Sequence, residues 1–233
     1  MALGVETERL SWPDFQSRFN WRQGEHVTLI GPTGCGKTTL TNELVKLRDW
    51  SIFLGSKRID DTQDKLKGLG FLTVKDVDSI HPDISNRWYV KPSFAHHLTA
   101  DELASQNREL IRGALMKAYR EGHWTVLVDE ARYVTDYLGL GREVVLLLTQ
   151  GRSQHNSMVI GTQRPRHVPL ECYDQASHLF FWRDPDGGNV KRIAEMAGID
   201  PREVPRVVAS LDRHEFLYRN IVTGESLITK VDA

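Results

Sequence analysis

The residues best suited to chemistry lie in the run HVTLIGPTGCGKTTL, which contains the pattern G-x-x-x-x-G-K-[ST] from Gly31 to Thr38. Residues 27–30 before it are mostly apolar and predict a buried strand, and residues 39–47 after it have the spacing of an amphipathic helix. A strand, a glycine-rich loop and a helix in this order are the context in which the pattern binds phosphate groups. The sequence therefore predicts a binding site for a nucleoside triphosphate.

The loop contains the residue types that phosphate binding requires. Its glycines let the backbone curl tightly and turn successive N–H groups inward, where the following helix also directs its positive end. Lys37 would supply a mobile positive charge to the β and γ phosphates, and the Thr38 hydroxyl would ligate a Mg²⁺ ion that bridges them. Cys35 lies in a variable position, where we expect a filler residue rather than a redox switch. The nucleotide-binding residues predicted from the pattern are Gly31, Pro32, Thr33, Gly34, Cys35, Gly36, Lys37, Thr38 and Thr39.

Two acids, Asp129 and Glu130, follow directly after the apolar run of residues 125–128. An acid at the first position can hold the Mg²⁺ ion through water, and an acid at the second can orient and deprotonate a water molecule for in-line attack on the γ phosphate. A solvated strand end is the simpler alternative, but the phosphate loop earlier in the chain favours the catalytic role. Many P-loop kinases and switch GTPases lack a carboxylate directly after the metal-linked acid, so Glu130 indicates water as the acceptor.

Polar residues also follow the apolar run of residues 157–160. Pro165 ends this strand and biases the residue before it to an extended conformation, which leaves Gln163 at the carboxyl edge, within reach of a γ phosphate. A glutamine that hydrogen-bonds within a loop is the alternative. Upstream, Arg152 closes a helix and could project into a neighbouring subunit as an arginine finger. A solvated cation at a helix end explains Arg152 equally well.

The composition is that of an ordinary soluble protein, with 233 residues, 40% hydrophobic, 26% charged and a net charge of −1. We expect a single P-loop ATPase domain over residues 1–233, with residues 1–24 as an N-terminal packing segment. Two distant cysteines form neither a disulfide framework nor a metal cluster, which favours a reducing compartment. Because no apolar stretch reaches membrane-spanning length and the N-terminus lacks a basic, apolar signal, we expect a cytoplasmic protein.

Strand and helix patterns alternate along the chain. Further strands are predicted at residues 50–54, 88–91, 157–160 and 178–182, and helices at residues 61–69, 101–122, 142–150 and 190–197, the last ending at Gly198. A helix from Pro201 and a hairpin of residues 215–218 and 226–231 complete the chain. This alternation predicts an α/β fold of the three-layer P-loop NTPase (RecA-like) type, with a mostly parallel central sheet flanked by helices and a C-terminal hairpin.

An aromatic series near the N-terminus, Trp12, Phe15, Phe19 and Trp21, has helix-like spacing. A packing face is the simpler explanation than a base-stacking platform. Stacking of Trp21 on adenine remains an open alternative.

Four segments together resemble the FtsK/HerA superfamily of ring-forming DNA-pumping ATPases: GPTGCGKTT, VLVDE, GRSQHNSMVIGTQRP and RIAEMAG. The similarity spans about residues 23–220, and the third segment discriminates best because many ATPases share the first two. The resemblance implies ATP and Mg²⁺ as cofactors, with Thr38 and Asp129 holding the metal. It also implies a homo-oligomeric ring, usually a hexamer, around duplex DNA. The catalytic residues would be Lys37 and Glu130, with Gln163 as the sensor of the γ phosphate and Arg152 acting in trans.

From this sequence we expect neither the membrane segment, nor the winged-helix tail, nor the N-terminal barrel of larger members of this superfamily. In size it is similar to the genome-packaging ATPases of tailless, membrane-containing viruses. The resemblance therefore implies a viral DNA-packaging motor in the host cytoplasm or on the virion, with a capsid or membrane vertex protein as a further candidate partner.

Because the net charge is near zero, DNA would have to contact a local basic patch. The candidates are Arg164, Arg166 and His167 after one strand, and Lys57 and Arg58 after another. Such clusters supply nonspecific phosphate contacts, although most charged clusters are only solvated surface.

Two functions of other classes remain open. A small-molecule kinase would use the same phosphate loop but has no use for Glu130. A P-loop ATPase for virion or membrane assembly would use the nucleotide as a switch without moving DNA.

Overall fold

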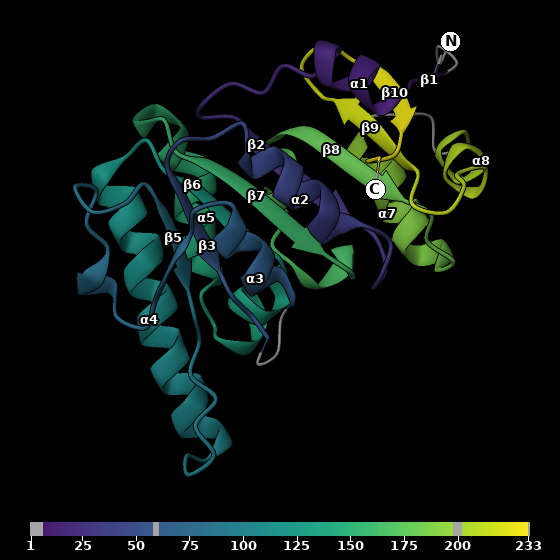
Figure 1. Ribbon diagram of the computed structural model, residues 1–233. Coiled ribbons are helices and arrows are strands. Elements are labelled where there is room, and N and C mark those ends of the chain that lie inside the picture. Colours follow the sequence, from purple (N-terminus) through teal and green to yellow (C-terminus); the bar gives the residue numbers. More distant parts are fainter. Residues whose placement is uncertain (1–6, 58–60, 198–201, 233) are drawn as a thin grey trace.

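The computed structural model describes residues 7–57, 61–197 and 202–232 (Figure 1). The strands in these ranges are β1 (Glu8–Arg9), β2 (His26–Ile30), β3 (Ser51–Leu54), β4 (Leu72–Val74), β5 (Arg87–Val90), β6 (Thr125–Val128), β7 (Ser157–Thr162), β8 (Ala176–Trp182), β9 (Phe216–Asn220) and β10 (Ser226–Thr229). They join in one sheet with the order β1-β10-β9-β8-β2-β7-β6-β3-β5-β4. From β8 to β4 all neighbours are parallel, whereas β9 is antiparallel to β8 and β10. The predicted mostly parallel sheet with a C-terminal hairpin is confirmed.

Helices cover both faces of this sheet (Figure 1). Helices α1 (Trp12–Arg18), α2 (Lys37–Val45) and α3 (Asp61–Gly68) pack on one face. The other face is covered by α4 (Ala100–Glu121), α5 (Gly141–Gln150), α6 (Glu171–Asp174), α7 (Gly187–Ala197) and α8 (Val204–Ala209). The helices and the sheet thus form the three layers expected from the sequence.

The central strands are apolar on both faces because each face meets a layer of helices. On β2, Val27 and Leu29 belong to the core under α1 and α2, whereas Ile30 belongs to the core under α4 and α5. Leu127 and Val128 on β6 divide in the same way. Parallel strands that are buried on both faces read as continuous apolar runs, which is why these strands were predictable.

The helix predicted at residues 101–122 is α4, and its ends follow from local chemistry. At the start, the Thr99 hydroxyl accepts a hydrogen bond from the Glu102 backbone and the Glu102 carboxylate accepts one from the Thr99 backbone, which is a capping box. At the end, Gly122 has a φ of 71°, which favours glycine.

Some elements differ from the sequence predictions. The short strands β1 and β4 and a π-helix η2 (Tyr133–Tyr137) were not predicted. Gly198 and Pro201, the predicted end of one helix and start of the next, lie outside the described residues, and α8 begins at Val204. Within the described ranges, no helix is both long and apolar enough to cross a lipid bilayer.

The N-terminal aromatic residues pack on the sheet rather than on a ligand. Phe15 is fully buried and stacks on Phe19, with 5.4 Å between the ring centroids. The Trp21 indole donates a hydrogen bond from Nε1 to the Glu25 carbonyl at 2.9 Å. Its ring is covered by the Arg48 guanidinium, which lies 3.6 Å from the ring centroid. Trp21 therefore stacks on an arginine, and the open alternative of stacking on adenine is not supported.

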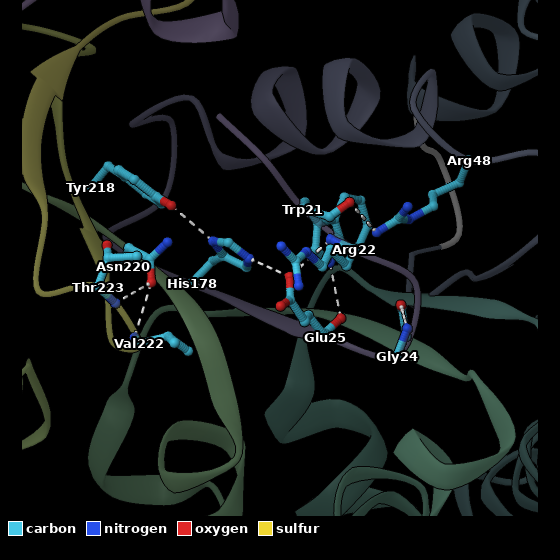
Figure 2. Close-up of polar contacts among 11 residues, drawn as sticks. Trp21, Arg22, Gly24, Glu25, Arg48, His178, Tyr218, Asn220, Val222 and Thr223 are labelled. Carbon is cyan, nitrogen blue, oxygen red and sulfur yellow. Dashed lines mark hydrogen bonds and ion pairs between the residues drawn. The ribbon is translucent and has the colours of Figure 1, made fainter. Parts of the chain in front are cut away.

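A buried polar chain ties the segment before β2 to the C-terminal hairpin (Figure 2). The Tyr218 hydroxyl lies 2.8 Å from Nδ1 of His178, and Nε2 of the same ring lies 3.1 Å from the Glu25 carboxylate. Burial lowers the pKa of His178, although its hydrogen bond with Glu25 opposes that shift. Two hydrogen bonds therefore link Glu25, strand β8 and strand β9, which are separate in the sequence.

His26, the first residue of β2, is buried in its neutral form. Nε2 lies 3.0 Å from the Leu148 carbonyl, which can only accept, so this nitrogen carries the proton. Nδ1 lies 3.1 Å from the backbone N–H of Met158 and accepts from it. Burial lowers the pKa of His26 to about 4, and the positive charge of Arg152 adds to this shift.

We expect His26 to make the protein less stable in acid. Since its pKa is lower in the folded than in the unfolded chain, stability is fully present above pH 6.5 and is lost as the pH falls toward 4. The loss should reach about 3 kcal/mol. Chemical unfolding of the wild type and of His26→Gln, which can keep both hydrogen bonds without titrating, should diverge in this window. Parallel pH curves for the two proteins would contradict the assignment.

Candidate active site

The sheet order brings four strand ends to one edge. The neighbours β2, β7, β6 and β3 are parallel, so the segments that follow their carboxyl ends meet there. These segments carry the phosphate loop, Gln163, the pair Asp129 and Glu130, and Lys57. They line a common cavity of about 590 Å³, which is large enough for a nucleotide.

The phosphate loop has the curled backbone expected from its glycines. Gly34 and Gly36 have φ angles of 76° and 115°, a region that disfavours residues with a side chain. The Lys37 ammonium donates hydrogen bonds to the carbonyls of Gly31 at 2.6 Å and Pro32 at 2.9 Å. The Lys37 ammonium, which we expected to bind phosphate, thus lies at the loop. In this structure it donates to backbone carbonyls.

Cys35 packs inside the loop, as a filler residue would. A Cβ on Gly31 would lie 2.8 Å from the Cys35 sulfur and 2.8 Å from Cβ of Trp182, so the loop is tightly packed at this point. Burial raises the pKa of the Cys35 thiol, which reduces its reactivity.

The corner between α2 and β6 offers oxygen ligands. The Thr38 hydroxyl donates a hydrogen bond to the Asp129 carboxylate at 3.2 Å, and Asp129 is buried. A hydroxyl and a carboxylate oxygen are the donors that Mg²⁺ prefers, so these two residues fit a magnesium ion bound together with phosphates. The other Asp129 oxygen forms an ion pair with Lys57 at 3.1 Å, a contact that was not predicted.

Gln163 lies beside the phosphate loop and Glu130. Its side-chain carbonyl accepts a hydrogen bond from the Thr33 hydroxyl at 2.7 Å, and Gln163 and Glu130 line the same cavity. Burial raises the pKa of Glu130, while the nearby charge of Lys37 opposes the shift. A buried carboxylate with a raised pKa is a stronger base than a solvated one, as proton abstraction from water requires.

The structure places Arg152 away from this cavity. Its backbone carbonyl lies 3.2 Å from the position of a Cβ on Gly24, which precedes β2, so Arg152 is at the amino edge of the sheet. Its side chain is exposed. Arg152 therefore does not reach the phosphate loop of its own chain, and its action on a neighbouring subunit stays a prediction.

The predicted basic clusters lie in different surroundings. Arg164 lines a second cavity of about 530 Å³, together with Glu130, Gln163 and the stacked rings of Tyr133 and Tyr137. Arg166 and His167 are exposed nearby in the chain. By contrast, Lys57 belongs to the nucleotide cavity, and Arg58 lies outside the described residues.

Residues from the C-terminal part complete the nucleotide cavity and were not predicted. They are Trp182, Arg213, His214, Phe216, Lys230, Val231 and Asp232. No pattern around them indicates a ligand: Trp182 comes to the phosphate loop because β8 pairs with β2, and the other residues come to it with the hairpin of β9 and β10.

Comparison with known sequences identifies the nucleotide-binding half. The family model described as ABC transporter matches residues 16–132, which include the phosphate loop and both acids after β6. The maltose/maltodextrin import ATP-binding protein MalK of Escherichia coli K12 is 38% identical over 53 residues. That match covers 22% of this chain and only 14% of MalK.

Solved structures align over most of the chain. The genome packaging NTPase B204 from Sulfolobus turreted icosahedral virus 2 has a TM-score of 0.63 at 16% identity, covering 91% of this chain and 99% of B204. The DNA-packaging ATPase B204 from Sulfolobus turreted icosahedral virus has a TM-score of 0.63 at 17% identity, covering 91% and 100%. VirB4 of Thermoanaerobacter pseudethanolicus has a TM-score of 0.62 at 10% identity, covering 89% of each chain.

These similarities confirm the fold that the resemblance to the FtsK/HerA superfamily implied. The matched segment of the family model is half of the sequence. The chain therefore belongs to the P-loop ATPase family that the ABC transporter model describes, and it has the fold of B204 and VirB4.

Proposed function

We propose that this chain is the ATP-hydrolysing subunit of a ring, with six copies expected, that moves duplex DNA during the packaging of a viral genome. The observation that carries the proposal is the hydrogen bond from Thr33 to Gln163 in the cavity that Glu130 also lines. It places the loop that would hold the phosphates in the same cavity as the acid that would activate water. In addition, the B204 neighbours are described as genome-packaging or DNA-packaging ATPases.

Water is the phosphoryl acceptor in this mechanism. The ATP phosphates lie against the backbone N–H groups of the loop and the start of α2, and Lys37 exchanges its carbonyl partners for phosphate oxygens. Thr38 and Asp129 would hold a Mg²⁺ ion, which would supply positive charge to the phosphates. Glu130 accepts a proton from the attacking water, and Gln163 exchanges its contact with Thr33 for one with the γ phosphate.

DNA would contact the exposed basic residues that follow Gln163 directly in the chain. Arg164, Arg166 and His167 are exposed, and a ring would repeat this segment in every subunit. Phosphate contacts of this kind are nonspecific in sequence, as the transport of a whole genome requires. Gln163 directly precedes Arg164, and only Pro165 separates Arg164 from Arg166. A movement of Gln163 during hydrolysis would therefore also move the arginines that contact DNA.

Arg152 could act in catalysis only on the nucleotide of a neighbouring subunit. Arg152 is exposed at the edge of the sheet opposite the phosphate loop. In a head-to-tail ring, one edge of a subunit can face the nucleotide of the next. Arg152 would then stabilise charge on the γ phosphate of that subunit.

Two substitutions should separate nucleotide binding from hydrolysis. Lys37→Ala removes a charged hydrogen-bond donor and should weaken ATP binding about tenfold to a hundredfold. Glu130→Gln keeps the shape but removes the base, so ATP should still bind while turnover falls at least about a hundredfold. Calorimetric binding and phosphate release measure the two effects, with Lys46→Ala at the end of α2 as the control. Undiminished turnover in Glu130→Gln would exclude water activation by this residue.

Duplex DNA should accelerate ATP turnover of the wild type in a salt-sensitive manner, because the contacts are to phosphates. Arg164→Ala combined with Arg166→Ala should lose this stimulation and keep the basal rate. Turnover is measured with and without DNA at two salt concentrations, and electron microscopy of the same samples shows whether rings form. Absence of stimulation in wild-type rings would favour the assembly role without DNA movement, and phosphoryl transfer to a small acceptor would favour the kinase.

Mixing inactive subunits tests the trans arginine. Arg152→Ala alone and Glu130→Gln alone should each lose turnover in the ring. A mixture of the two should recover part of it, because some interfaces combine an intact Glu130 with an intact Arg152 from the next subunit. Arg142→Ala, an exposed arginine on α5, is the matched control. If Arg152→Ala alone turns over ATP at the wild-type rate, Arg152 has no catalytic role.

A further inference from the structure

Two cavities meet at the acid and the glutamine of the candidate active site. Glu130 and Gln163 line the nucleotide cavity of about 590 Å³, and the same two residues line the second cavity of about 530 Å³. They therefore form a wall that the two cavities share. The other residues that line the second cavity are Arg132, Tyr133, Asp136, Tyr137 and Arg164.

We propose that the second cavity is the route by which inorganic phosphate leaves the protein after ATP is cleaved, while ADP is still bound to the phosphate loop. This inference rests on the proposed hydrolysis of ATP, and it assigns the step that follows cleavage. In that reaction the oxygen of water bonds to the γ phosphorus and the bond to the β–γ bridging oxygen breaks, which yields ADP and inorganic phosphate. The freed phosphate then lies between the shared wall and the like charge of ADP, which repels it toward the wall.

Two guanidinium groups line the second cavity and suit the passage of an anion. Arg164 directly follows Gln163, is exposed and makes no ion pair within the described part of the chain. Arg132 forms an ion pair with Asp136 at 3.2 Å, and its side chain is 47% exposed. Since exposed ion pairs are weak and a guanidinium matches the geometry of phosphate oxygens, phosphate can replace Asp136 as the partner of Arg132.

The shared wall carries little charge when phosphate has to cross it. In the proposed mechanism Glu130 has just accepted a proton from the attacking water, so its carboxyl group is neutral at this stage. Gln163 is uncharged, and its side-chain carbonyl accepts a hydrogen bond from the Thr33 hydroxyl, which can be exchanged. The wall therefore does not repel phosphate at the moment of its release.

The outer wall of the second cavity is the π-helix η2, which combines a fixed backbone with exposed side chains. Val134 and Leu138 are 1% and 2% exposed and pack in the core, which anchors this segment. The ring of Tyr133 stacks on the ring of Tyr137 with 5.6 Å between the centroids, and Tyr137 is 59% exposed. Helical turns of this type are rare and occur frequently at functional sites. The tyrosine rings can therefore move aside for an ion while the backbone stays in place.

Rapid kinetics separate cleavage from release. Quench flow measures the cleavage of ATP in a single turnover, and a fluorescent phosphate sensor measures free phosphate, both with Mg²⁺ and without DNA. In Arg132→Ala we expect release to be about tenfold slower, because a charged hydrogen-bond donor is lost, and cleavage to keep its rate. Arg132→Lys keeps a cation and should restore most of the release rate. Arg206→Ala, an exposed arginine on α8 outside both cavities, is the control and should match the wild type.

A phosphate analogue tests the same route without hydrolysis. Beryllium fluoride binds beside ADP in the place of the γ phosphate, and it enters by the exit route in reverse. The rate at which it traps a fluorescent ADP should fall about tenfold in Arg132→Ala and rise in Tyr137→Ala, in which the cavity is wider. This rate does not depend on cleavage, so it also decides the outcome for a variant that cleaves ATP slowly.

Wild-type rates of phosphate release in Arg132→Ala, or analogue entry that neither variant changes, would overturn the assignment and place the exit at the mouth of the nucleotide cavity. A wild type that cleaves no ATP would contradict the proposed hydrolysis, and analogue entry would still decide the route. A wild type that cleaves ATP but does not respond to DNA would contradict the motor alone.

Discussion

The close approach of β6 and β7 at their carboxyl ends is the constraint on which the site depends. A Cβ on Gly161 would lie 2.4 Å from the Asp129 carbonyl, closer than any side chain can come to a backbone oxygen. Only glycine therefore lets the two strands stay paired at this point. The pairing sets Asp129 and Glu130 beside Gln163, and because β7 also pairs with β2, the same strand carries Gln163 to Thr33. The absence of a side chain at Gly161 therefore allows the spacing between the phosphate loop, residues 129–130 and Gln163.

Two lysines that line the cavity already have partners within the protein. Lys37 is held by two carbonyls, and Lys57 is paired with Asp129. Burial and the Asp129 charge oppose ionisation of Glu130, while Lys37 and Gln163 favour it. Binding of a triphosphate would therefore exchange partners rather than bring charges into an empty, apolar space. Such an exchange makes the arrangement of Glu130 sensitive to what the loop holds, because Lys37 contacts the loop and lies near the acid.

The nucleotide-binding core could be predicted from sequence because its signals are local. The phosphate loop, Asp129 with Glu130, and Gln163 each follow a recognisable apolar strand, and parallel strands place their carboxyl ends together. The role of Lys57 was not predictable, because a cation after a strand has no pattern that distinguishes a partner of Asp129 from a surface residue. His214 was missed for a different reason: only the register of the hairpin places it beside Cys35. The function of Arg152 depends on a second subunit, which no single chain contains.

The pairing of β1 with β10 affects how the chain reaches its folded state. Residues 8 and 9 pair in register with residues 227 and 228, so β1 cannot join the sheet until residues 227 and 228 have been synthesised. Contacts between segments so distant in sequence form slowly, since a large loop must close before they are made. On the ribosome, the phosphate loop would emerge well before β10, so the β1–β10 edge of the sheet and the part of the nucleotide cavity lined by residues 230–232 would be completed after the loop.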